Sequence, residues 1–150
     1  MKNVHTTIAK TVAAILFASF AGIAAAGGTQ DITVSATVSA VCKFPTQTLT
    51  LTFDAIDPSS LTDATKDVTV PFKCTNGVTP TITPSSLNGG NLKSGAETLA
   101  YGFALQGSMP AGTGFSAVVN ATYRGTITQA NFQNAKALTY TDTVTLTINN

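Results

Sequence analysis

The chain has 150 residues, of which 43% are hydrophobic and 10% charged, and eight basic residues stand against seven acidic ones. This balance, without any cluster of lysine or arginine, argues against nucleic acid or an anionic membrane surface as a partner. The only histidine is His5, and no Ser-x-x-Lys, Gly-x-Ser-x-Gly or paired-carboxylate motif occurs, so we expect neither an enzyme nor a cofactor.

Residues 1–26 have the pattern of an export signal. Lys2 and Lys10 precede an apolar run from Thr11 to Ala26, which closes in three consecutive alanines. We expect cleavage after Ala26, which leaves 124 of the 150 residues and six basic residues against seven acidic ones. No later apolar run is long enough for a membrane anchor, so the sequence predicts an exported chain of one domain.

The segment from Ile32 to Cys42 alternates between apolar and hydroxyl side chains. One parity carries Ile32, Val34, Ala36, Val38, Ala40 and Cys42, and the other carries Thr33, Ser35, Thr37 and Ser39. Since successive side chains of a strand face opposite sides, the pattern predicts a strand with one apolar face. At about 3.3 Å per residue it would span roughly 35 Å, about twice the usual strand length. Alternation of this kind by itself favours an ordinary first strand of the domain, and the alternative is a strand that serves another molecule.

Six stretches of period two after Cys42 predict further strands, separated by turns rich in glycine, asparagine and proline. They cover residues 48–53, 68–74, a short stretch around Ile82, 99–105, 115–128 and 138–148. Pro71 cannot donate a ladder hydrogen bond, which places its strand at an edge or a bulge. The pattern predicts an all-β, immunoglobulin-like β-sandwich. Such sandwiches usually have seven strands, so six own strands leave one to be supplied by residues 32–41 or by another molecule.

Cys42 and Cys74 are the only cysteines. In an exported chain they predict one disulfide, because a metal site needs more ligands than two thiolates. Closing a loop of about 33 residues is expected to stabilise the fold by roughly 3 to 4 kcal/mol.

Two other groups of residues invite a binding interpretation. The acids Asp54, Asp57, Asp63 and Asp67 lie within fourteen residues. Their spacing does not match a calcium-binding EF-hand loop, so solvation of a polar loop is the simpler interpretation and no metal is expected. The aromatic residues Tyr101, Phe103, Phe115, Tyr123 and Tyr140 are candidates for a sugar-binding surface. Most share a strand register with aliphatic residues, which favours core packing instead.

Several segments in sequence order together resemble one family. An export signal and an alternating segment that ends in a cysteine are followed by Phe72-Lys73-Cys74-Thr75-Asn76-Gly77, by Leu99-Ala100-Tyr101 and by Tyr140-Thr141-Asp142-Thr143-Val144-Thr145-Leu146-Thr147. The combination resembles spore coat protein U domain proteins, which include the major pilin subunits of archaic chaperone-usher pili. The chain departs from the family pattern in having no tryptophan in its second half and in ending with Asn149-Asn150 instead of an aromatic residue.

The resemblance implies a sandwich that lacks its last strand. A periplasmic chaperone would complete it first, and at the outer-membrane usher the N-terminal segment of the next subunit would take over. Residues 1–26 would be the signal, 27–41 the donor-strand segment and 42–150 an incomplete immunoglobulin-like pilin domain. The donor side chains Ile32, Val34, Ala36 and Val38 would fill a groove on an identical subunit, giving a head-to-tail filament.

The expected function is therefore that of a structural subunit of an adhesive pilus, or fimbrium, on the cell surface, supporting attachment and biofilm formation. The alternative is a monomeric exported adhesin or coat component whose sandwich is complete in itself.

Overall fold

The computed structural model describes residues 27–46 and 48–150, so the predicted signal lies outside the described residues. Contacts divide the chain into two units, with the boundary between Thr37 and Val38. Residues 27–37 form no helix or strand, and each of them is exposed. The strand predicted from Ile32 to Cys42 is therefore not formed as one element, since only Cys42 lies in a strand.

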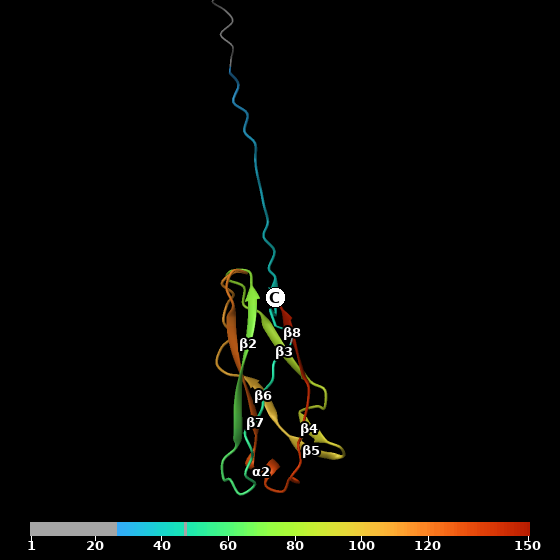
Figure 1. Ribbon diagram of the computed structural model, residues 1–150. Coiled ribbons are helices and arrows are strands. Elements are labelled where there is room, and N and C mark those ends of the chain that lie inside the picture. Colours follow the sequence, from blue (N-terminus) through green and yellow to red (C-terminus); the bar gives the residue numbers. More distant parts are fainter. Residues whose placement is uncertain (1–26, 47) are drawn as a thin grey trace, which may run out of the picture. The chain divides into compact units, whose positions relative to one another are not determined.

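The unit Val38–Asn150 consists of antiparallel β-structure, which confirms the predicted all-β class (Figure 1). One sheet has the order β1 (Cys42–Lys43), β2 (Ala64–Cys74), β7 (Val119–Ile127) and β6 (Gly102–Leu105). Two further pairs are β3 (Thr81–Ser86) with β8 (Val144–Asn149), and β4 (Asn91–Ser94) with β5 (Glu97–Ala100). The short helix α2 (Gln129–Phe132) follows β7, and among the described residues no helix is long and apolar enough to cross a membrane.

The four-stranded sheet and the β3–β8 pair pack against each other through their apolar faces. Alternate residues of β2 and β7 face inward, as the period of two predicts. The buried members of this cluster are Val70, Phe72, Cys74, Ile82, Ala121 and Tyr123. Leu146 and Ile148 of β8 contact the same cluster, so one core joins the two sheets.

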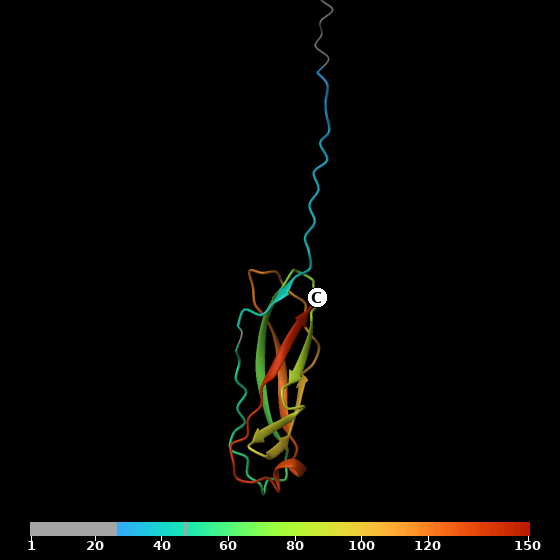
Figure 2. The ribbon, with the colours of Figure 1, turned by 90° about the vertical axis from the view of Figure 1, so that its right-hand side faces the viewer.

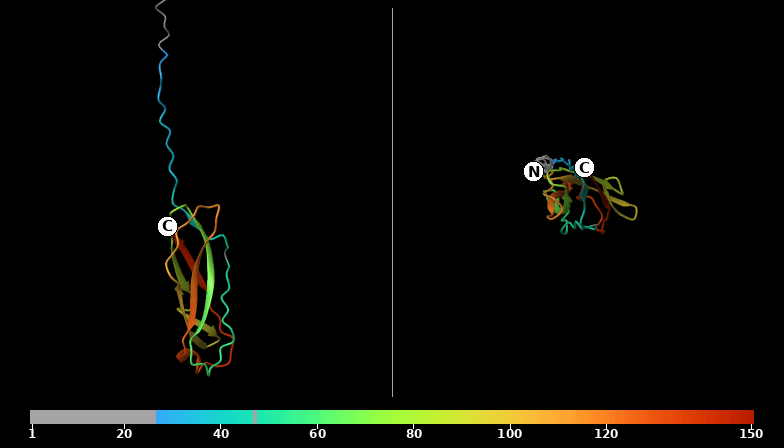
Figure 3. Two further views of the ribbon diagram at one scale, coloured as in Figure 1. Left: turned by 90° about the vertical axis from the view of Figure 1, so that its left-hand side faces the viewer. Right: turned by 90° about the horizontal axis from the view of Figure 1, so that it is seen from above.

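A second, smaller core lies at the other end of β7. Its buried residues are Leu99 of β5, Ile127 of β7 and Phe132 of α2. Phe53 and Tyr140 pack against it from segments that form no strand of their own. The loops of residues 57–63 and 133–141 lie at this end of the unit (Figure 3).

The strands differ from the sequence prediction in several places, and β7 and β8 begin at Val119 and Val144 rather than at residues 115 and 138. Residues 48–53 form no strand, although Leu51 and Phe53 are half-buried between exposed threonines as the alternation predicts. Residues 85–95, a stretch between two predicted strands, contain β4, because Gly95, with φ of +60°, makes the tight turn that pairs β4 with β5. The strand predicted over 99–105 is split into β5 and β6 at Tyr101.

The predicted disulfide between Cys42 and Cys74 is confirmed. It joins the first strand to the end of β2, where the two cysteines face each other in the ladder. Pro71 pairs with Asn120 of β7, and β1 reaches β2 only at Lys73 and Cys74. At Pro71, β2 therefore has no strand paired on its second side within residues 27–46 and 48–150, which agrees with the edge position expected for a proline.

Candidate functional site

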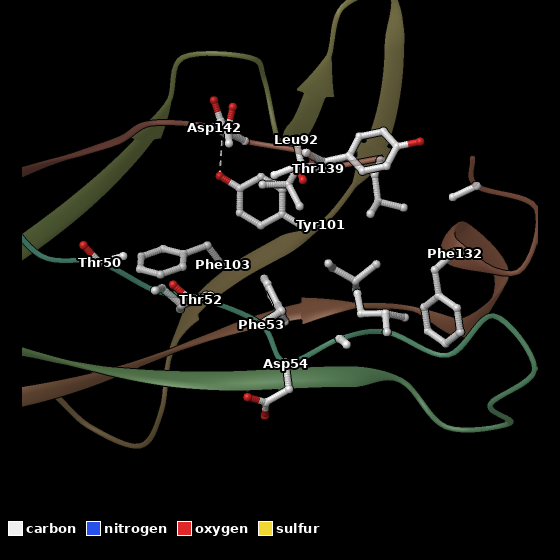
Figure 4. Close-up of a pocket in the computed structure, with 18 of the residues that line it drawn as sticks. Thr50, Thr52, Phe53, Asp54, Leu92, Tyr101, Phe103, Phe132, Thr139 and Asp142 are labelled. Atoms are coloured by element: carbon white, nitrogen blue, oxygen red, sulfur yellow. Dashed lines mark hydrogen bonds between the residues drawn. The ribbon is translucent and has the colours of Figure 1, made fainter. Parts of the chain in front are cut away.

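An apolar groove of about 770 Å³ runs along the unit Val38–Asn150 (Figure 4). One wall is the stretch from Leu49 to Ile56, and the other is the stretch from Leu138 to Leu146. Its floor comes from the inner face of the four-stranded sheet and from β5 and α2. The floor residues are Val68, Val70, Leu99, Tyr101, Phe103, Ile127 and Phe132. The family resemblance implies a groove, but the sequence did not indicate which residues would line it, because the lining comes from separate segments that only the fold brings together.

The first wall, residues 49–56, is an extended stretch without a strand partner, and we call it the wall segment. Figure 2 follows it as a ribbon without an arrow along the side of the strands. Within the described chain, no main-chain hydrogen bond involves any of these residues. Phe53 and Leu51 nevertheless point inward, because a Cβ atom added to Gly125 would lie 2.8 Å from the Phe53 ring and 3.3 Å from Leu51. The wall segment is thus held by side chains alone, with its main-chain groups available for pairing.

The second wall includes β8, which has a strand on one side only. All six residues of β8 pair with β3, and in the part of the chain that is described no strand pairs with its other edge. Val144 and Leu146 are half-buried and line the groove. An open edge next to exposed apolar surface is a template for pairing with another strand. The groove is therefore flanked by two unpaired main chains, the wall segment and β8.

A polar cluster around Asp142 fixes the second wall just before β8 begins. Its carboxylate accepts hydrogen bonds from the hydroxyl of Tyr101 at 2.7 Å, the hydroxyl of Ser86 at 2.5 Å and the amide of Asn88 at 2.8 Å. Partial burial would raise the pKa of Asp142, but the bonds from Ser86 and Tyr101 and from main-chain N–H groups hold it below its usual value. Burial and the bond to Asp142 raise the pKa of Tyr101 to about 12.

The sequence offered one signal for this cluster, since Tyr101 and Asp142 both lie in segments that carried the family resemblance. Their contact could not be predicted, because the two residues are 41 positions apart. Figure 4 shows the bond between them at the rim of the groove, above the ring of Phe103. The cluster ties the β3–β4 turn to the chain that leads into β8, and so sets the position of that wall.

The four acids weighed for metal binding each have a separate role. Asp54 pairs with Lys66 and Asp67 with Arg124, while Asp57 accepts hydrogen bonds from Ser59 and Asp63 accepts one from the main chain of Gln129. Over residues 27–46 and 48–150 no three histidine, cysteine, aspartate or glutamate side chains come together as a metal site would require. The acids therefore hold loops and strands in place.

The aromatic residues weighed for sugar binding mostly pack inward. Tyr123 is buried and stacks on Phe103 with ring centroids 5.2 Å apart. Tyr101 and Tyr140 are half-buried and line the groove, whereas Phe115 is exposed on a loop. Core packing accounts for Tyr123 and Phe103, and three of the five residues belong to the groove lining: Tyr101, Phe103 and Tyr140.

The predicted donor residues lie outside any strand. The side chains of Ile32, Val34 and Val38 are 81%, 87% and 83% exposed, and Ala36 is exposed as well. Three branched apolar side chains at alternate positions, all in water, form an apolar stripe that has no packing partner within the described residues.

Comparisons of the chain with known protein families, with curated proteins and with solved structures found no match.

Proposed function

We propose that this chain is a structural subunit of an adhesive surface pilus, polymerised through the chaperone-usher route by donor-strand exchange. In this proposal Val38–Asn150 form an immunoglobulin-like sandwich that lacks one strand. The N-terminal segment of an identical subunit supplies that strand. The filament supports attachment and biofilm formation.

The observation that carries the proposal is the groove between two unpaired main chains. The wall segment and the free edge of β8 both offer unpaired N–H and C=O groups on either side of an apolar floor. One extended strand laid between them would satisfy both edges and cover the floor, which is the pattern of β-augmentation. The exposed residues Ile32, Val34, Ala36 and Val38 have the alternation that such a strand needs.

The dimensions of donor and groove agree. At about 3.3 Å per residue, the stretch from Ile32 to Val38 spans roughly 20 Å, and the wall segment spans roughly 25 Å. Burying three branched side chains at about 1.5 to 3 kcal/mol each, together with Ala36, gives roughly 5 to 10 kcal/mol before ladder bonds and ordering costs. Because association and strand ordering themselves cost several kcal/mol, the main-chain ladders on both sides of the donor strand must add to this gain.

The missing strand also determines which partners the assembly needs. An open apolar groove on an exported chain invites aggregation, so a periplasmic chaperone would cover the groove. At the outer-membrane usher, the N-terminal segment of the next subunit would then replace the chaperone. Because each subunit both gives and receives a strand, the contact is head-to-tail and does not close on itself. Repetition of such a contact gives an open filament.

Deleting residues 28–40 tests the proposal. The deletion removes the donor strand and leaves the residues of the groove intact, so we expect no filaments and a subunit that accumulates bound to its chaperone. Electron microscopy of shed surface material and a ladder of heat-sensitive oligomers on a denaturing gel are the measurements. Filaments that persist after the deletion would defeat the proposal, as would an unmodified chain that is only a compact monomer in solution.

A further inference from the structure

The β3–β8 pair has two open edges, and we propose that Pro84 is a specificity-determining residue that closes the edge on β3 to other chains. Within the described residues β3 and β8 pair only with each other, so a further strand could be added beside either of them. With the β3 edge closed, a new strand pairs only with β8, in the groove. The inference rests on the proposed function, because it concerns where a donor strand can pair.

The hydrogen bonds between β3 and β8 give the direction of each main-chain group. Just beyond β3, the N–H of Leu87 donates to the carbonyl of Thr143 at 2.8 Å, and the register of the strands places these two residues opposite each other. Bonded and non-bonded pairs alternate along an antiparallel ladder. Three positions further along, Pro84 and Leu146 are therefore a non-bonded pair, and each turns its main-chain groups away from the other strand.

The open edge of β8 is suited to strand addition. By the same alternation, Val144, Leu146 and Ile148 turn both their N–H and their carbonyl away from β3. No other main-chain bond in the described chain involves these groups. The side chains of Val144 and Leu146 line the groove. A strand beside β8 therefore meets a free donor and a free acceptor at every second residue, next to the apolar floor.

The open edge of β3 offers no such position. Its outward residues are Ile82, Pro84 and Ser86, and Pro84 has no N–H. The carbonyl of Ile82 already accepts a bond from the hydroxyl of Tyr123 at 3.1 Å, and the carbonyl of Ser86 accepts one from the N–H of Gly89 at 3.4 Å. None of the three outward residues thus has both a free donor and a free acceptor, and the proline stands between the other two.

Pro71 has the corresponding position in the four-stranded sheet. The N–H of Gln106 donates to the carbonyl of Thr122 at 2.8 Å, so every second residue of β7, including Asn120, turns its main-chain groups toward β6. Pro71 lies opposite Asn120 and is therefore in a non-bonded pair, which turns its nitrogen to the open side of β2. This proline interrupts the open edge of β2 beside β1.

The distribution of prolines separates the groove from the other long edges. Of the six prolines of the chain, only Pro71 and Pro84 lie in strands, and both are on open edges that do not flank the groove. Neither β8 nor the wall segment contains a proline. The strands β1, β4, β5 and β6 have four residues or fewer, and short edge strands are poor templates for pairing. Prolines and strand length together leave the groove as the place where a strand can be added.

The test measures self-association of full chains that all carry Val34→Asp, which puts a carboxylate on the apolar face of the donor strand. Pro84→Val restores an N–H to the edge of β3. It is expected to raise the association constant, measured by sedimentation equilibrium, at least about fivefold, which corresponds to the usual net value of one hydrogen bond. Thr83→Val is the matched control, because it places the same side chain in the same strand at a residue whose N–H points to β8. The control is expected to associate no more strongly than the chain with Val34→Asp alone.

A second variant covers the case in which valine prevents folding. Pro84→Ala restores the same N–H with a smaller side chain, and it is also expected to raise the association constant. Electron microscopy of the unmodified chain is carried out in parallel. If that chain forms filaments and neither Pro84 variant associates more strongly than the control, Pro84 has no such role, whereas the proposed function stands. If the unmodified chain is only a monomer, the proposed function fails, and the inference with it.

Discussion

If the proposed function is right, replacing Val34 with aspartate should block assembly without harming the fold of the subunit. In the unassembled chain the Val34 side chain is 87% exposed, so Val34→Asp removes no contact within the fold. In a filled groove it would lose the burial of valine, about 1.5 to 3 kcal/mol, and would leave an unpaired carboxylate in an apolar site at a further cost of several kcal/mol. A combined loss of at least about 4 kcal/mol corresponds to a roughly 1,000-fold weaker contact between subunits.

The assay is the temperature at which oligomers dissociate on a denaturing gel, combined with electron microscopy of filaments. Ser35→Asp is the matched control, because Ser35 has the opposite parity and its carboxylate would face water on an inserted strand. We expect filaments from Ser35→Asp and none from Val34→Asp, with equal amounts of folded subunit. Equal filaments from both variants would refute the alternation argument on which the donor strand depends.

Three further predictions concern the strand unit. Gly125→Ala should lower the free energy of unfolding by about 1 to 3 kcal/mol in urea, because its Cβ would overlap the wall segment, whereas Gly102→Ala, whose nearest atom is 3.9 Å away, should be tolerated. Replacing Cys42 and Cys74 with alanine should lower the free energy of unfolding by about 3 to 4 kcal/mol, and adding a reductant should do the same to the unmodified chain alone. Because the pKa of Asp142 is lowered in the fold, its ionised form contributes stability above the ordinary value of 3.8, and this is lost as the pH falls through the folded-state pKa. Asp142→Asn should therefore be less stable than the unmodified chain at neutral pH and should lose less stability on acidification. Thermal unfolding measured from neutral pH down to about pH 2 checks both expectations. If stability falls with pH equally in both chains, the carboxylate of Asp142 does not have this role.

The elements that the sequence predicted well are those whose pattern is set by burial on one face. Val70 and Phe72 alternate with Pro71 and Lys73, and the structure buries the first two within a long paired strand. The disulfide was equally predictable, since two cysteines in a chain predicted to be exported leave one pairing. Both predictions need only the sequence: the alternation is visible within one segment, and the disulfide follows from the number of cysteines.

The wall segment shows that periodicity predicts burial but does not by itself predict a strand. Leu51 and Phe53 face inward as the alternation predicts, yet residues 48–53 form no strand. Alternation reports that a segment has one buried face, whereas a strand also needs a partner for its main chain. No partner for this segment lies within the described residues, and a sequence pattern does not contain that information.

Other features were out of reach because distant residues make them. The cluster of Asp142 with Tyr101 and Ser86 joins positions 41 and 56 residues apart, and nothing local marks either contact. The β4–β5 pair was hidden for another reason, because a run rich in glycine and asparagine favours a loop until Gly95 is seen to make a hairpin turn.

The disulfide at the base of the N-terminal segment has a mechanical consequence. β1 contains only two residues, and tension along its chain would peel so short a ladder apart one bond at a time. The bridge from Cys42 to Cys74 passes that load directly to β2, an eleven-residue strand in the middle of the sheet. If such subunits form a fibre, pulling on it would separate the exchanged strands before any subunit unfolds, as long as the disulfide between Cys42 and Cys74 is intact.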